Sequence, residues 1–256
     1  MNICLLMFVS CARDLFLPRL ELLIFCILLF SISICTCQSR NEYIVNPNQT
    51  QYFVAGSAFT LPGGTFLYKN TNLFLHSISF GLTDNVSLGV GTEFYRFFTN
   101  AENDRSPSLY LLAPKLGFQL APKVYFAVGG DVVFYRDKIF EEEEHTGTQK
   151  AGLGYALLTY GTFNRNLTVG GYAVPTNEGF NEKVFIFNVS AIRTIGRKVA
   201  IVGESWFFPD KTKAFDGGTR FFGNRAAVDL GLATYFENDN EWDYTIIPYF
   251  DYTWSF

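Results

Sequence analysis

The chain has 256 residues, of which 48% are hydrophobic, 18% aromatic and 17% charged, and its formal net charge is −4. This length suits one large domain or two small ones, and the many aromatic and few charged residues exclude a disordered chain. The acidic balance argues against a nucleic-acid-binding protein, which needs a basic face.

The first 37 residues differ in composition from the rest of the chain. They contain all five cysteines and both methionines, whereas every glycine, tyrosine and tryptophan lies after them. Residues 22–34 are an apolar run, preceded by Arg13 and Arg19 and followed by the small residues Cys35-Thr36-Cys37. A run of about thirteen residues is too short for a membrane-spanning helix and is typical of a secretory signal peptide. We expect residues 1–37 to be a signal peptide that is removed before Gln38.

Two other interpretations of this leader stay open. Cys37 could be lipidated, although Ile34-Cys35-Thr36 is a poor lipobox, or the apolar run could be retained as a membrane anchor. Translation could start at Met1 or at Met7. Cleavage after Cys37 would leave residues 38–256, which contain no cysteine. An exported chain without thiols can hold neither a disulfide scaffold nor a thiolate zinc site.

Beyond residue 50, apolar and polar residues alternate, which is typical of β-strands with one apolar and one polar face. Residues 86–94 place Val86, Leu88, Val90 and Phe94 on one face, with serine, glycine and glutamate among the residues between them. Residues 124–134 and 226–235 repeat this pattern. Because no amphipathic helical pattern follows residue 40, we expect an all-β fold.

Two classes of turn interleave along the chain. The tight turns are Thr83-Asp84-Asn85, Ala121-Pro122-Lys123, Asn164-Arg165-Asn166, Gly196-Arg197-Lys198 and Gly223-Asn224-Arg225. The long polar loops are residues 100–107, 136–150, 175–183, 209–217 and 237–243. The result is an internal repeat of roughly 30 to 40 residues, each unit a hairpin with a long loop. Short turns at one end and long loops at the other are typical of a transmembrane antiparallel up-and-down β-barrel.

Counting the predicted strands gives about twelve. The tight turns join ten strands, residues 244–256 supply the last, and residues 51–61 are expected to be the first, joined to the second by the turn Pro62-Gly63-Gly64 on the long-loop side. We expect residues 38–50 to be a periplasmic lead-in and residues 51–256 to form the barrel, with both chain ends on the periplasmic side. Loops 136–150 and 209–217 should face outward. The strand ending at Phe222 is short unless it begins near Lys213, with a bulge at Asp216-Gly217-Gly218.

The C-terminal strand carries the most specific local signal. Aromatic residues occupy alternate positions before the terminal Phe256, as Tyr252 and Trp254 show. This pattern resembles the terminal strand of Gram-negative outer-membrane β-barrel proteins, and GLTDNVSLGVG resembles a periplasmic turn of that class. The resemblance implies an outer-membrane location, contact with outer-membrane lipid, and recognition of the last strand by the barrel-assembly machinery. We expect Tyr252, Trp254 and Phe256 to form a periplasmic aromatic girdle.

A soluble β-sandwich or lipocalin-like barrel is the alternative fold. Such proteins also alternate, but they turn the apolar face inward around a closed core. Here the apolar face is rich in aromatic and branched side chains, and the other face is largely glycine, serine, threonine and acidic residues. This inside-out pattern favours the membrane barrel.

Charged residues on the polar face are the candidate lining of the lumen. They are Glu93, Asp131, Glu204, Asp229, Asp251 and Lys115. Acidic side chains that ring a pore select cations, so these residues predict a passive channel with an acidic-leaning lumen that could pass small solutes or ions. A plugged structural barrel is the competing prediction, with Arg96, Arg193 and Arg220 as counter-charges if they turn inward. A component of a surface or secretion assembly is a further alternative.

An outer-membrane lipid hydrolase is the least favoured function. Such enzymes present histidine and serine two residues apart on one strand, where both side chains share a face. His76 is instead followed by Ser77 and Ser79, which lie on the opposite face, so we expect no catalytic residues and no enzyme. The run Glu141-Glu142-Glu143-Glu144 before His145 is most simply a solvated loop. No cofactor or metal motif occurs, and we expect neither.

Overall fold

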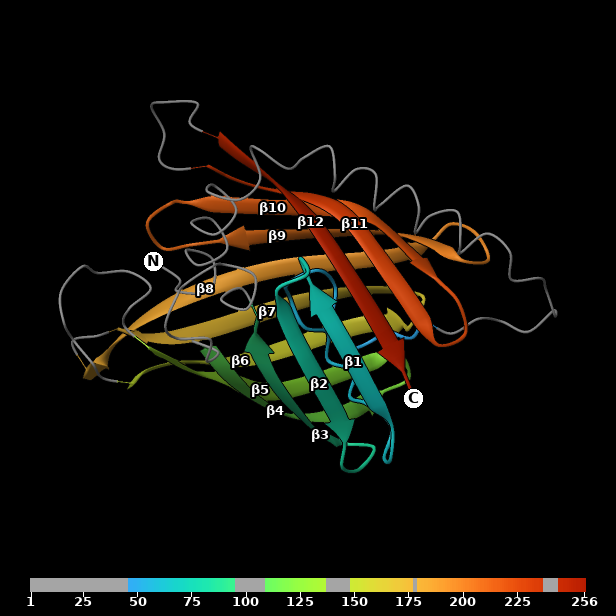
Figure 1. Cartoon of the computed structure of the whole chain (residues 1–256), viewed down its shortest axis with the longest axis horizontal. Coiled ribbons are helices and arrows are strands. Elements are labelled where there is room, and N and C mark those ends of the chain that lie inside the picture. Colours follow the sequence, from blue (N-terminus) through green and yellow to red (C-terminus); the bar gives the residue numbers. More distant parts are fainter. Residues whose placement is uncertain (1–45, 95–108, 137–147, 177–178, 237–243) are drawn as a thin grey trace. The chain divides into compact units, whose positions relative to one another are not determined.

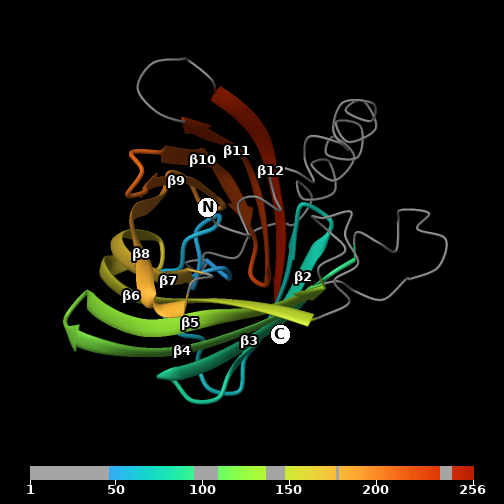
Figure 2. The same ribbon diagram turned by 90° about the vertical axis from the view of Figure 1, so that its left-hand side faces the viewer.

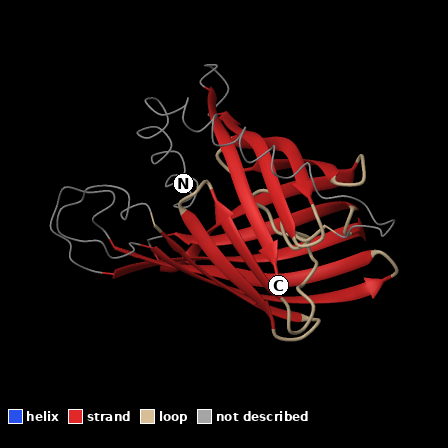
Figure 3. Cartoon of the chain, turned by 45° about the vertical axis from the view of Figure 1, so that its right-hand side comes forward, coloured by secondary structure: helices blue, strands red, loops and turns tan. Residues whose placement is uncertain are grey.

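The computed structural model describes residues 46–94, 109–136, 148–176, 179–236 and 244–256. Its strands are β1 (Phe66–Thr71), β2 (Leu75–Gly81), β3 (Val86–Glu93), β4 (Leu109–Ala121), β5 (Val124–Arg136), β6 (Thr148–Thr162), β7 (Arg165–Thr176), β8 (Gly179–Thr194), β9 (Val199–Phe207), β10 (Lys213–Phe222), β11 (Ala226–Phe236) and β12 (Tyr244–Ser255). Each strand pairs antiparallel with the next, and β1 pairs with β12, so the sheet closes on itself (Figures 1 and 3). The predicted fold class, an all-β antiparallel barrel of twelve strands, is confirmed.

The described residues contain no helix that is long and apolar enough to cross a membrane. The predicted signal peptide, residues 1–37, lies outside the described residues, as do the acidic run before His145 and Arg96.

The strands form because each alternates between an apolar outer face and a polar inner face. On β7, Leu167 and Val169 are about half exposed, while Asn166 and Thr168 between them are buried. Exposed phenylalanine, leucine, isoleucine and valine side chains recur on the outer face of the other strands. A soluble monomer rarely exposes so much contiguous apolar surface, and such a belt marks contact with a membrane.

All five predicted tight turns connect neighbouring strands. They join β2 to β3, β4 to β5, β6 to β7, β8 to β9 and β10 to β11. Lys123 in the second turn follows Pro122 and has a φ of 66°, the left-handed conformation that the residue after proline adopts in a type II turn. The end of the barrel where these turns meet, together with the start of β1 and the end of β12, is called the tight-turn end below.

The predicted first strand, residues 51–61, is wrong. The count of twelve holds because residues 65–81, which were expected to be a single strand, form both β1 and β2. These two strands are joined by Asn72-Leu73-Phe74, in which Asn72 and Leu73 have φ values of 50° and 67°. Leucine rarely adopts this left-handed conformation. The sequence therefore shows no ordinary turn residue at the second position, and the turn was not predicted.

The turn Pro62-Gly63-Gly64 lies at the tight-turn end and not, as predicted, on the long-loop side. The Gly63 amide donates a hydrogen bond to Asp84 Oδ1, 2.9 Å away in the β2–β3 turn. The Gly64 amide donates to the Gly81 carbonyl, 2.8 Å away at the end of β2. The short connection on the long-loop side is therefore the one between β1 and β2.

Two of the predicted long loops are shorter than expected because the strands beside them extend further. After a register shift beyond Pro175, the last pair of β7 and β8 is Thr176 with Gly179, so only residues 177–178 separate the two strands. β9 and β10 are separated by residues 208–212 alone. β10 begins at Lys213, which is the start expected if the strand ending at Phe222 was not to be short. Its register with β9 and β11 is continuous, so the predicted bulge at Asp216-Gly217-Gly218 is wrong.

Candidate functional site

Residues 46–61, called the lumen segment below, run through the interior of the barrel. Figure 2 shows this segment in blue, enclosed by the strands. At one end the Asn46 amide donates to Asn164 Oδ1 in the β6–β7 turn (3.2 Å), and at the other the segment leads into Pro62 beside Asp84. Midway the chain reverses direction, with the Tyr52 amide donating to the Ala55 carbonyl at 2.9 Å. The segment therefore enters and leaves at the tight-turn end. Residues 46–50, the end of the predicted periplasmic lead-in, belong to this segment.

Arg220 on β10 is the central anchor of the lumen segment. Its guanidinium forms a bidentate ion pair with Asp229 on β11, with both N–O distances 2.7 Å. The remaining N–H groups donate to three backbone carbonyls of the segment, those of Asn48 (2.6 Å), Gln51 (3.1 Å) and Tyr52 (2.8 Å). All five donors of the guanidinium are thus used. Arg220 joins the wall of the barrel to the backbone of the segment while it is itself fully buried.

Glu204 on β9 holds the point where the segment reverses. Its carboxylate accepts hydrogen bonds from the consecutive backbone amides of Phe53, Val54 (3.0 Å) and Ala55 (3.0 Å). Trp206 Nε1 donates a fourth hydrogen bond, at 3.2 Å. Successive amides that converge on one carboxylate form an anion-binding nest, so dipoles of the segment stabilise negative charge on Glu204.

Lys69 and Asp251 form a second ion pair, which spans the closure between β1 and β12. Lys69 Nζ lies 2.7 Å from Asp251 Oδ2 and donates to Gln51 Oε1 (2.9 Å) and the Phe53 carbonyl (3.1 Å). The Tyr249 hydroxyl also donates to the Phe53 carbonyl, at 2.6 Å. The same charged pair therefore both closes the barrel and binds the segment.

Apolar contacts fill the space around these polar anchors. The Phe53 ring packs against Tyr249 with ring centroids 4.8 Å apart, and Gly231 makes room for it, because a Cβ there would lie 2.9 Å from the ring. Gly117 makes room for the returning part of the segment, since its Cβ would lie 2.8 Å from Thr60. These glycines let the wall approach the segment closely.

A hydroxyl network fixes the other side of the segment. The Tyr52 hydroxyl donates to Asn166 Oδ1 and contacts the Thr168 hydroxyl on β7. Burial raises the pKa of Tyr52 above its ordinary value, so the phenol keeps its proton. The Ala58 amide donates to Thr159 Oγ1, 2.7 Å away on β6.

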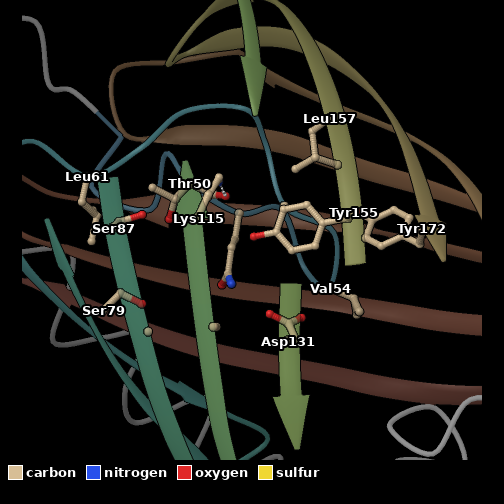
Figure 4. Close-up of a pocket in the computed structure, with 14 residues that line it drawn as sticks. Thr50, Val54, Leu61, Ser79, Ser87, Lys115, Asp131, Tyr155, Leu157 and Tyr172 are labelled. Carbon is tan, nitrogen blue, oxygen red and sulfur yellow. Dashed lines mark hydrogen bonds between the residues drawn. The ribbon is translucent and has the colours of Figure 1, made fainter. Parts of the chain in front are cut away.

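A cavity of about 90 Å³ remains between the lumen segment and the wall. Figure 4 shows Lys115 and Asp131 from neighbouring strands at this cavity, together with Tyr155. Lys115 Nζ also donates to the Thr50 carbonyl of the segment, at 3.3 Å. A cavity of this volume has room for only a few water molecules.

The structure places all six predicted lumen residues on the inner face of the wall. Glu204, Asp229, Asp251 and Lys115 contact the lumen segment or its anchors, Asp131 lines the cavity, and Glu93 is buried. Their predicted part in selecting ions stays a prediction.

Of the candidate counter-charges, Arg220 turns inward and Arg193 is exposed on the outside. The sequence interpretation missed Lys69 and Asp216, which opposes Glu204 across β9 and β10. The signal that could have found Lys69 was its place in an alternating stretch, Leu67 and Lys69 facing one way and Tyr68 the other.

His76 on β2 lies on the face opposite Ser77 and Ser79. Its Nδ1 lies 2.8 Å from the Tyr68 hydroxyl, and its ring contacts Phe94 edge-on with centroids 4.7 Å apart. That no enzyme activity resides here stays a prediction. Among the described residues, no group of acidic, histidine or cysteine side chains could hold a metal ion.

Tyr252, Trp254 and Phe256 lie at the tight-turn end of β12. The Trp254 ring lies between the other two, with its centroid 6.4 Å from that of Tyr252 and 6.4 Å from that of Phe256. Trp254 and Phe256 are exposed. Asp251 and Thr253, which alternate with them, are buried. The three aromatic side chains therefore line the outer surface at this end, the position that the predicted girdle requires.

Solved structures similar to this chain are barrels of bacterial outer membranes. A KdgM porin in complex with disordered oligogalacturonate is 8% identical, with 75% of this chain and 98% of that chain covered and a TM-score of 0.49. An outer membrane channel from Pseudomonas putida F1 is 13% identical, with 79% and 99% covered and a TM-score of 0.36. The outer membrane protein Omp33 of Acinetobacter baumannii is 9% identical, with 75% and 96% covered and a TM-score of 0.37. No protein-family model and no curated protein sequence matches the chain.

The closed antiparallel wall, its apolar exterior and its charged interior together define a transmembrane β-barrel of the outer-membrane type. The lumen segment occupies the interior of this barrel, the space that is filled with water in open barrels and plugged in others.

Proposed function

We propose that the protein is an outer-membrane channel that its own lumen segment holds closed. The observation that carries the proposal is the course of residues 46–61 through the lumen, anchored by Arg220, Glu204 and Lys69. Eight strands enclose a space that side chains alone can fill, whereas sixteen leave an aqueous channel. A twelve-stranded barrel lies between these cases, so its side chains alone do not fill the interior, and a further segment of chain is needed to close it.

The chemistry of the contacts favours a segment that can leave. Residues 46–61 contain no charged side chain, and they meet the wall charges mainly through backbone carbonyls and amides. Arg220 pairs with Asp229, and Lys69 with Asp251, wholly within the wall. Departure of the segment would leave these pairs intact, and water could replace its backbone groups.

The open lumen would favour cations. The inner face carries Glu93, Asp131, Glu204, Asp216, Asp229 and Asp251 against Lys69, Lys115 and Arg220 among the described residues. An excess of carboxylates along a pore attracts cations and repels anions.

A permanently plugged structural barrel is the second candidate function. It is favoured by the complete use of the Arg220 donors, which suits a fixed structure. The two candidates differ in whether weakening one anchor of the segment opens the lumen.

Membrane location is tested with the full chain in cells. We expect the protein to sediment with the outer membrane and to migrate faster on a gel before boiling than after, because the closed barrel resists detergent until it is heated. A protein that is soluble without detergent and migrates identically in both samples would contradict the membrane barrel.

Channel function is tested by potassium efflux from liposomes that contain the purified protein. We expect slow efflux with the wild type and markedly faster efflux with Glu204→Ala, because three backbone amides of the segment lose their acceptor. Asp210→Ala, in the exposed β9–β10 loop, is the matched control and should behave as the wild type. Fast efflux from the wild type would show that the segment does not close the lumen. Equal, slow efflux from Glu204→Ala would instead support the structural barrel.

A further inference from the structure

Two arginines oppose each other on the outer surface of the barrel. Arg165 on β7 and Arg193 on β8 are paired in register, and both side chains are exposed. Like charges directly opposite on neighbouring strands are destabilising. The next residues across the sheet are Thr162 on β6 and Ile201 on β9, neither of which carries a charge. Within the described part of the chain neither guanidinium forms an ion pair. Among the described residues, no anion balances the two opposed guanidinium groups.

The surroundings of this pair are basic as well. Lys123, Arg197 and Arg225 are exposed in other turns of the tight-turn end. The carboxylate in the described tight turns is that of Asp84, which already accepts the Gly63 amide. The chain as a whole has a net charge of −4, so this end departs in sign from the rest of the protein and attracts anions.

Apolar side chains lie directly beside the arginine pair on the same outer face. Leu167 and Val169 follow Arg165 along β7, Val189 precedes Arg193 on β8, and Ile195 follows it. The guanidinium groups thus lie at the edge of the apolar belt, where it meets the tight-turn end. In a membrane this is the level at which acyl chains give way to phosphate headgroups.

We propose that Arg165 and Arg193 together bind the phosphate of an anionic phospholipid. The proposal rests on the proposed membrane location of the barrel. Each guanidinium can donate two parallel hydrogen bonds to phosphate oxygens, and one phosphate between them removes the repulsion across the strand pair. The acyl chains of the same lipid would lie along Leu167 and Val169. This combination of a charge pair and an adjoining apolar strip selects a lipid over free phosphate.

The test measures lipid binding to the full-length barrel in a neutral detergent by native mass spectrometry. The probes are phosphatidylglycerol and phosphatidylcholine with identical acyl chains. We expect phosphatidylglycerol to bind the wild type about tenfold more tightly than phosphatidylcholine, and Arg165→Gln/Arg193→Gln to lose this preference. Lys123→Gln/Arg225→Gln removes the same charge from the same end and should retain most of it. Equal loss in both double variants would overturn the site in favour of diffuse attraction.

Thermal unfolding gives a second test, in which the difference in unfolding temperature between the double variant and the wild type should change sign when lipid is added. In neutral detergent without lipid, Arg165→Gln/Arg193→Gln should unfold at or above the wild-type temperature, because the repulsion is gone. With phosphatidylglycerol present the order should reverse, because only the wild type gains a bound lipid. The same stabilisation by inorganic phosphate alone would assign the pair to free phosphate and overturn the lipid site. An unchanged order under both conditions would also overturn it.

Failure of the lipid site can be distinguished from failure of the proposed channel function. The faster gel migration before boiling shows for each variant that the barrel has folded. Neither arginine contacts the lumen segment, so potassium efflux should be unchanged in Arg165→Gln/Arg193→Gln. A folded, closed barrel without lipid preference would reject the lipid site and leave the proposed channel intact.

Discussion

Replacing Arg220 by methionine is expected to lower the free energy of unfolding by about 3–5 kcal/mol. The change leaves the fully buried carboxylate of Asp229 without its cation, and it removes the guanidinium donors from the carbonyls of Asn48, Gln51 and Tyr52. A buried charge that loses its partner is among the most destabilising changes in a folded protein. The measurement is urea unfolding of the reconstituted barrel, followed by tryptophan fluorescence and by gel migration before boiling.

Two companion variants separate the charge effect from the loss of side-chain volume. Arg225→Met alters an exposed arginine in the β10–β11 turn and should change the free energy of unfolding by no more than about 0.5 kcal/mol. Arg220→Met/Asp229→Leu removes the orphaned carboxylate and should recover part of the loss. A single variant as stable as Arg225→Met would show that Arg220 does not anchor the segment.

From β3 onward the wall of the barrel could be predicted because it depends on local patterns. Alternation gave each strand its outer face, as in Leu167 and Val169 on β7, and the five tight turns set the strand order. Up-and-down topology pairs each strand with its neighbour in sequence, so little long-range information is needed. The faces of the six predicted lumen residues follow from the same alternation.

The lumen segment escaped prediction because it resembles a strand without being one. Residues 51–61 are rich in aromatic and small residues, and apart from the exposed Val54 both sides of the chain are largely buried, as Tyr52, Phe53, Ala58 and Phe59 show. A wall strand exposes every second side chain, whereas this segment buries adjacent side chains. The small residues Ala55-Gly56-Ser57-Ala58, which interrupt the alternation, were the available signal.

The anchors were beyond sequence reasoning because their partners are far apart in the chain. Lys69 pairs with Asp251 only after the first and last strands meet. Glu204 receives amides from residues about 150 positions earlier. A buried acid at a strand position looks the same in sequence whether it lines water or holds a segment.

Deleting residues 46–61, so that residue 45 joins Pro62, is expected to turn a closed barrel into an open channel. The twelve strands keep their hydrogen bonds, and the ion pairs Arg220–Asp229 and Lys69–Asp251 remain within the wall. The vacated lumen is lined by charged side chains that water can solvate. We expect steady conductance at least an order of magnitude above that of the full chain, with a preference for cations that Asp131→Asn reduces.

Single-channel conductance in planar bilayers, recorded for the full chain and for the variant without residues 46–61, tests the central claim most directly. Both proteins must first show the faster gel migration of a folded barrel. The account predicts that the full chain stays closed or opens rarely, while the shortened chain gives steady, cation-preferring openings. Equal conductance of the two proteins, whether both are open or both are silent, would contradict closure of the barrel by the lumen segment.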